Sequence, residues 1–169
     1  MPVDSFLLDT SIATTAWDGR HESHSKVRER LKGLEQYIFV CVVTIAEVEY
    51  GLKTAPQIDG ERQEQVRIAM AQYKPFPIDK HTAEAYSSIR AELFKTHSPR
   101  GQRKRLTVKR VSDLRERTTD KDLGIQENDL WITSVALQYN FVLLTSDKKM
   151  KPLLEMSRRI FCLRYEIWA

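Results

Sequence analysis

The chain has 169 residues, of which 41% are hydrophobic and 30% charged, and its formal net charge is +4. This size and composition indicate one soluble globular domain with a buried core. The sequence contains no apolar run near the roughly 20 residues of a membrane-spanning helix and no secretory signal at its start. Cys41 and Cys162 lack the paired spacing of metal ligands. We therefore expect a cytoplasmic protein with no membrane partner and two buried free thiols.

In chain order, short apolar runs alternate with stretches of helical periodicity. The first run, residues 6–8, predicts a strand that ends on Asp9, and Thr10 and Ser11 begin the helix after it. Further strands are expected at 37–43, 76–78, 142–144 and 160–165. Helices are expected at 23–34, 44–52, 61–73 and 80–94 and from Asp129 onward. This alternation predicts an α/β fold in which helices cover both faces of a central parallel sheet.

The positive charge is concentrated in one segment, at about 97–124. Between His97 and Lys121 there are nine Lys or Arg residues against three Asp or Glu residues, so the rest of the chain is net negative. Such a charge run is often only a solvated loop, but Lys and Arg also bind the backbone of nucleic acids. The candidate contacts are Arg100, Arg103, Lys104, Arg105, Lys109 and Arg110.

Acidic residues stand at the strand ends, or on the helices that begin there, in four places: Asp9, Glu47, Asp129 and Asp147. Each has a simpler explanation, because Asp9, Asp129 and Asp147 can cap helices or turns, and Thr44 and Glu47 are spaced as a capping box. Independent caps, however, need not converge. Since sites in open parallel sheets form beyond the carboxyl ends of the strands, we expect the four carboxylates to gather there.

A cluster of carboxylates needs a compensating positive charge, because like charges in a confined site raise one another's pKa. Mg²⁺ or Mn²⁺ suits such a site, since these hard cations prefer oxygen ligands and leave positions open for water and phosphate oxygens. Glu49 is a competing candidate beside Glu47. It lies about 200° further around the same helix and should therefore point away. An acidic metal site together with a basic segment is suited to cutting nucleic acid.

Short motifs in a characteristic order also resemble those of the PIN-domain ribonucleases, most of all the VapC-type toxins of bacterial toxin–antitoxin pairs. In chain order they are "FLLDTS", "TIAEVEYGL", "AYSSIRAEL", "NDLWITSVAL", "FVLLTSD" and the final apolar-Trp pair Ile167-Trp168. Each motif is short and degenerate by itself, whereas their order and spacing span the whole chain. A phosphoacceptor receiver domain fits less well, because it would need adjacent acids after the first strand, where Asp9 is followed by Thr10.

The resemblance implies a single three-layer α/β/α domain over 1–169 and an Mg²⁺- or Mn²⁺-dependent endoribonuclease that forms a homodimer and is inhibited by a small antitoxin. It implies that Asp9, Glu47, Asp129 and Asp147 bind the metal and act in catalysis. The accessory polar residues would be Thr10, Ser11, Asn128 and Thr145. The basic insertion departs from the family, in which a short turn is common at this place. A non-catalytic RNA-binding module and an RNA-processing nuclease outside a toxin–antitoxin pair remain as alternatives.

Overall fold

The chain folds around a five-stranded parallel sheet with the strand order β3-β2-β1-β4-β5. The structure is a computed structural model that describes residues 4–57, 59–98, 108–116 and 119–168. The strands are β1 (Phe6–Leu8), β2 (Ile38–Cys41), β3 (Pro75–Phe76), β4 (Val142–Thr145) and β5 (Arg164–Ile167). Because all neighbouring pairs are parallel, the carboxyl ends of the strands lie at one edge of the sheet.

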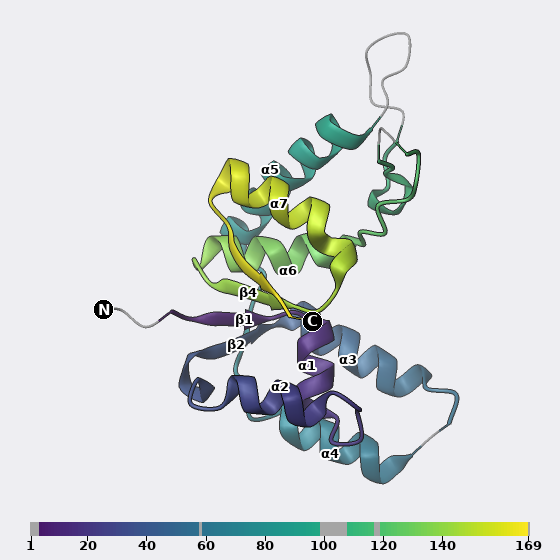
Figure 1. Ribbon diagram of the computed structural model, residues 1–169, viewed down its shortest axis with the longest axis vertical. Coiled ribbons are helices and arrows are strands. Elements are labelled where there is room, and N and C mark those ends of the chain that lie inside the picture. Colours follow the sequence, from purple (N-terminus) through teal and green to yellow (C-terminus); the bar gives the residue numbers. More distant parts are fainter. Residues whose placement is uncertain (1–3, 58, 99–107, 117–118, 169) are drawn as a thin grey trace.

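Helices cover both faces of this sheet, as Figure 1 shows, which confirms the predicted three-layer α/β/α fold. Below the sheet in that view lie α1 (Thr10–Trp17), α2 (His24–Leu31), α3 (Val42–Thr54) and α4 (Gly60–Met70). Above it lie α5 (Lys80–His97), α6 (Glu127–Gln138) and α7 (Lys151–Phe161). Short 3₁₀ turns are η1 (Glu35–Tyr37), η2 (Val111–Asp113) and η3 (Lys148–Met150). Within the described ranges, no helix combines the length and the apolar character that crossing a bilayer requires.

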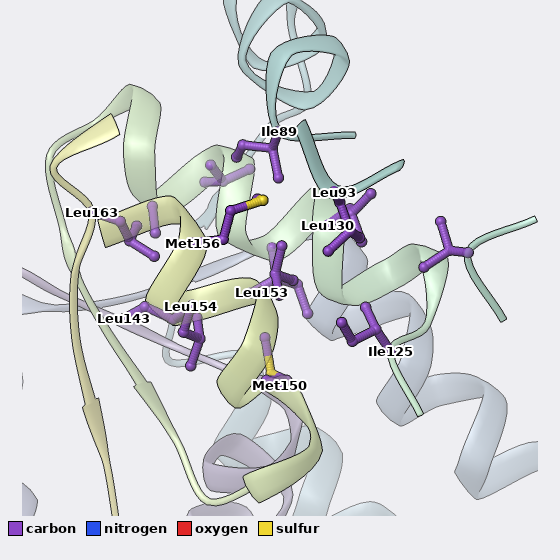
Figure 2. Close-up of a cluster of buried hydrophobic side chains, with 14 of the residues drawn as sticks. Ile89, Leu93, Ile125, Leu130, Leu143, Met150, Leu153, Leu154, Met156 and Leu163 are labelled. Carbon is purple, nitrogen blue, oxygen red and sulfur yellow. The ribbon is translucent and has the colours of Figure 1, made fainter. Parts of the chain in front are cut away.

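The sheet separates two hydrophobic cores, because successive strand residues point to opposite faces. Leu7 packs into the core under α5, α6 and α7, whereas Leu8 packs into the core formed by α1 and α2. Figure 2 shows the first core, where Leu143 of β4 lies against Leu153 and Leu154 of α7. Since these side chains are fully buried, truncating Leu143 to Ala would cost about 2–5 kcal/mol of stability.

The strand order reverses direction at β1. From β1 the chain runs outward through β2 to β3, and it then returns to place β4 and β5 on the other side. The register pairs Leu8 with Leu144, and the Asp9 amide donates to the Leu144 carbonyl at 2.9 Å. Asp9 and the residues after Thr145 therefore lie side by side at the topological switch point, where open α/β sheets bind ligands.

Two expectations about the second strand and its helix are wrong. The helix expected from Thr44 begins at Val42, with Cys41 as its cap residue, so the strand ends earlier than its β-branched sequence suggests. The helix also continues beyond its expected end at residue 52, to Thr54. Cys41 itself is a buried free thiol, as expected.

The C-terminal strand also begins later than expected. Ile160 and Phe161 belong to α7, whose buried face includes Leu153 and Leu154. The helix ends at Cys162 in a left-handed backbone conformation with φ 62°, and this free thiol is exposed rather than buried. The apolar run at 160–163 thus spans the end of a helix and a turn. A short apolar run of this kind has the same sequence pattern as a buried strand, so the sequence alone does not distinguish the two.

The described ends of the basic insertion pack onto the protein. Val111 and Leu114 on one side, and Leu123 and Ile125 on the other, are buried in the core under α5, α6 and α7. An isolated antiparallel bridge pairs Arg115 with Asp122. These contacts attach the two ends of the insertion to the helix layer above the sheet.

Candidate functional site

The four predicted acids all lie at the carboxyl edge of the sheet. Asp9 follows β1, and Asp147 follows β4. Glu47 lies on α3, which starts at the end of β2, and Asp129 lies in the first turn of α6. Thr145 Oγ1 connects Asp9 to the Asp147 amide, and Glu47 accepts the side chain of Asn128, the neighbour of Asp129. The structure therefore brings together the acids that the sequence singles out.

Asp9 is buried, with 4% of its surface exposed, and is held by hydroxyl groups. The Oγ of Ser11 donates to Asp9 Oδ2 at 2.7 Å, and Thr145 Oγ1 donates to the same oxygen at 2.8 Å. Burial raises the pKa of the Asp9 carboxyl, and the two hydroxyl hydrogen bonds offset only part of this rise. Asp9 also caps α1, so its structural and candidate functional roles coincide.

Glu47 joins three helices and does not act as a helix cap. The Thr10 hydroxyl on α1 donates to one carboxylate oxygen, and the Asn128 Nδ2 on α6 donates to the other at 2.8 Å. Thr44, its expected capping partner, is buried inside α3 rather than at its start. The capping-box explanation for Glu47 is therefore wrong. Its contacts to two other helices hold its carboxylate at the candidate site.

Asp129 has the most perturbed acidity of the group. Burial raises its pKa from an ordinary 3.8 to about 7, and the carboxylates of Asp9, Asp147 and Glu47 add to this rise. The backbone amide of Gln126 donates to Asp129 Oδ2 at 2.6 Å and acts in the opposite direction. Gln126, not Asn128, is the cap residue of α6. Strongly raised carboxyl pKa values of this kind are common in functional sites.

Two hydroxyl groups connect the loop after β4 to Asp9. Thr145 Oγ1 accepts the Asp147 amide at 3.0 Å while it donates to Asp9. Ser11 Oγ accepts the Ser146 amide at 3.0 Å and also donates to Asp9. The side chain of Asp147 accepts the Lys149 amide at 2.8 Å and so begins η3. The accessory positions Thr10, Ser11, Asn128 and Thr145 all contact one of the acids.

The donor set suits a hard divalent cation, although it does not form a ready cage. Carboxylate, amide and hydroxyl oxygens are the ligands that Mg²⁺ and Mn²⁺ prefer. The pKa of Asp129 is raised mainly by burial and, to a smaller extent, by the neighbouring carboxylates. In the part of the chain that the structure describes, no three acidic, His or Cys side chains converge closely enough to hold one ion. The chemistry of the residues fits the metal, whereas their spacing requires bridging water or side-chain rotation.

Two further acids near the candidate site, Glu49 and Glu127, form ion pairs with arginines on neighbouring helices. Glu49 pairs with Arg67 of α4 at 3.0 Å, which confirms that it points away from Glu47. Glu127, which the sequence analysis did not single out, pairs with Arg90 of α5 and accepts the Tyr86 hydroxyl. Glu127 could have been identified from the sequence because it stands next to Asn128, a predicted site residue.

The basic insertion reaches the first turn of α6 through Arg90. The Nη2 of Arg90 donates to the Lys109 carbonyl at 2.9 Å, while the Nη1 of Arg90 pairs with Glu127. Lys109 and Arg110 are exposed. The other predicted nucleic-acid contacts lie outside the described residues: Arg100, Arg103, Lys104 and Arg105.

Several solved bacterial structures have a similar fold. VapBC2 from Rickettsia felis, bound to a DNA fragment from its promoter, is 20% identical over 97% of this chain and 98% of its own, with a TM-score of 0.64. DNA-bound VapBC from Salmonella typhimurium is 21% identical over 99% and 100%, also with a TM-score of 0.64. FitAcB from Neisseria gonorrhoeae is 17% identical over 95% of each chain, with a TM-score of 0.60. At these identities the likeness is one of fold.

The sequence itself also matches a family. No curated protein matches the chain, but the model of the PIN domain matches residues 6–153. This match begins at β1 and extends into α7, so it includes all four acids of the candidate site. The chain belongs to the PIN domain family.

Proposed function

We propose that the protein is a metal-dependent endoribonuclease that cleaves RNA phosphodiester bonds. The observation that carries this proposal is the gathering of Asp9, Glu47, Asp129 and Asp147 at the topological switch point of a PIN domain. A carboxylate cluster beside a basic segment is a combination that cation-assisted cleavage of a polyanion requires. The catalytic domain in this proposal is the single unit 1–169.

The four carboxylates would hold Mg²⁺ or Mn²⁺, directly or through water. When bound, such an ion supplies an activated water and stabilises charge on the phosphate. The protein's own polar groups keep the ligands in place: Ser11 and Thr145 orient Asp9, and Thr10 and Asn128 orient Glu47. These hydrogen bonds keep Asp9 and Glu47 in fixed orientations, and water molecules would bridge the remaining distance between the carboxylates and the cation.

The biological setting that we propose is the toxin of a toxin–antitoxin pair. The similarity in fold to VapBC from two bacteria and to FitAcB supports this setting. The partner would be a small antitoxin protein that covers the acidic site, and the toxin would form a homodimer. Expression of the protein alone should then arrest bacterial growth, whereas Asp129→Asn should not. Equal growth arrest by both forms would separate toxicity from the acidic site.

Cleavage assays with purified protein test the enzymatic part of the proposal. The wild type should cleave RNA with added Mg²⁺ or Mn²⁺ and stop with EDTA. Asp9→Asn keeps the size of the side chain but removes its charge, so activity should fall by roughly two orders of magnitude or more. Glu49→Gln is the matched control, because Glu49 pairs with Arg67 away from the site. RNA binding without cleavage by the wild type would favour a non-catalytic RNA-binding module.

A further inference from the structure

A cleft of about 420 Å³ lies between α1 and α2 and adjoins the acidic site. We refer to it as the α1–α2 cleft. Thr10, Ser11 and Ser146 are among the residues that line it. Ser11 donates to Asp9, and Thr10 donates to Glu47. Thr10 and Ser11 therefore line the cleft and also contact the acids of the site. A group bound in the cleft would therefore be a direct neighbour of a group bound among the acids.

The chemical character of the α1–α2 cleft is opposite to that of the acidic site. Its lining includes the basic side chains of His21, Lys26 and Arg30, and no Asp or Glu is among the described residues that line it. Hydroxyl groups supply most of its other polar surface. By contrast, a cleft of about 350 Å³ between α3 and α4 is lined by three acids, Asp18, Glu47 and Asp59, and by the basic Arg62, which pairs with Asp18. The α1–α2 cleft is thus the one of these two that suits an anion.

One basic side chain of the cleft, that of Arg30, packs against Trp168 near the C-terminus. The Arg30 guanidinium lies 4.0 Å from the centre of the Trp168 ring. Trp168 is held in turn by its Nε1, which donates to Glu166 at 2.9 Å, and by its backbone amide, which donates to the Thr145 carbonyl at 2.7 Å. Lys26 lies four residues before Arg30 on α2, so both side chains share one helix face. The cationic face of α2 is in this way connected to the end of β4.

We propose that the α1–α2 cleft binds the RNA strand next to the bond that is cut, with Lys26 and Arg30 binding a backbone phosphate. This inference rests on the proposed function. An acidic cluster repels the phosphates on either side of the scissile one, so cations beyond the cluster are needed to hold the strand. The volume of the cleft falls in the range of small-molecule sites, roughly 300–1,000 Å³, which is enough for one nucleotide unit.

The cleft and the described ends of the basic insertion lie on opposite faces of the sheet. Helices α1 and α2 are in the layer below the sheet in Figure 1, whereas the insertion connects α5 to α6 above it. A strand held at both places would cross the carboxyl edge, where the four acids lie. The α1–α2 cleft is therefore a phosphate-binding place separate from the insertion, and the two can be tested independently.

The test compares two double variants of the same helix region. Lys26→Gln with Arg30→Gln removes two charges that line the cleft, and Arg28→Gln with Lys32→Gln removes two exposed charges that do not. Binding of a fluorescent single-stranded RNA is measured in EDTA across a salt series. The first variant should bind roughly tenfold more weakly, with a salt slope smaller by about 0.7, the change expected when the contact to one phosphate is lost. The second should stay within about twofold of the wild type.

Further measurements separate charge from packing, because Arg30 also contacts Trp168. Arg30→Lys keeps the charge and should retain most of the RNA affinity and salt slope, even if the melting temperature falls. Equal RNA affinity of the two double variants, or a loss in Arg30→Lys as large as in Arg30→Gln, would overturn the inference. Lost affinity for an acidic peptide with unchanged RNA affinity would also overturn it. Wild-type protein that neither binds nor cleaves RNA would instead refute the proposed function.

Discussion

Thr145 Oγ1 donates a 2.8 Å hydrogen bond to Asp9 Oδ2 across a sequence separation of 136 residues. Both residues are buried, and they stand at the ends of the two central strands. The same hydroxyl accepts the amide of Asp147 at 3.0 Å. One threonine thus connects two acids of the candidate site through a single oxygen atom.

This contact predicts the effect of Thr145→Val, which keeps the shape of the side chain and removes the hydroxyl. Asp9 would lose a donor in a buried position, so the free energy of unfolding should fall by about 1–3 kcal/mol. The pKa of Asp9 should rise further, because the Thr145 hydroxyl now lowers it. Urea denaturation measures the stability, and Thr145→Ser is the control that keeps the donor. Equal losses in both variants would show that the methyl group matters and the hydroxyl does not.

The pKa of Asp129 predicts how the metal-free protein responds to pH. Its carboxyl titrates near pH 7 in the folded state, against an ordinary value of 3.8. Because the folded pKa is the higher one, this contribution to stability is fully present below about pH 4 and is lost as the pH rises through about 7. Melting temperatures in EDTA should therefore show a decline in the wild type that Asp129→Asn lacks. Parallel curves for the two proteins would contradict the raised pKa.

Divalent cations should stabilise the protein by compensating the clustered carboxylates. At neutral pH, Mg²⁺ or Mn²⁺ should raise the melting temperature of the wild type, since a ligand that binds only the folded state stabilises it. The rise should be much smaller in Asp9→Asn and in Asp129→Asn, and Glu49→Gln should respond like the wild type. Identical rises in all four proteins would place the bound cation elsewhere.

The basic insertion should contribute to RNA affinity in a way that depends on salt. Replacing Arg103, Lys104 and Arg105 with Ala should weaken RNA binding and reduce the salt slope by up to about 2, if each makes one phosphate contact with single-stranded RNA. The response to metal should not change. Loss of antitoxin affinity with unchanged RNA cleavage would assign these charges to the protein partner. If RNA binding, salt slope and partner binding all match the wild type, the segment is a solvated loop.

The sequence by itself determined the order of the elements and the identity of the acids. Strands such as Phe6–Leu8 are continuous apolar runs because helices cover both faces of the sheet. Such a run is a local feature of the chain, so it can be recognised without knowing the tertiary structure. Asp9 follows such a run directly, and Asp147 follows β4 after one intervening residue, Ser146. Since parallel strands end at one edge, the chain order of strand and acid was sufficient to predict that the four acids stand at the same edge of the sheet.

Tertiary structure alone decided which partner each polar group has. Glu47 and Thr44 have the spacing of a capping box, but the partners of Glu47 lie 37 and 81 residues away, at Thr10 and Asn128. Arg30 meets Trp168 only because β5 returns beside β4. Local sequence patterns report the period of a helix or strand, whereas such contacts depend on how distant elements pack. The acids were therefore predictable from the sequence, and the cleft that adjoins them was not.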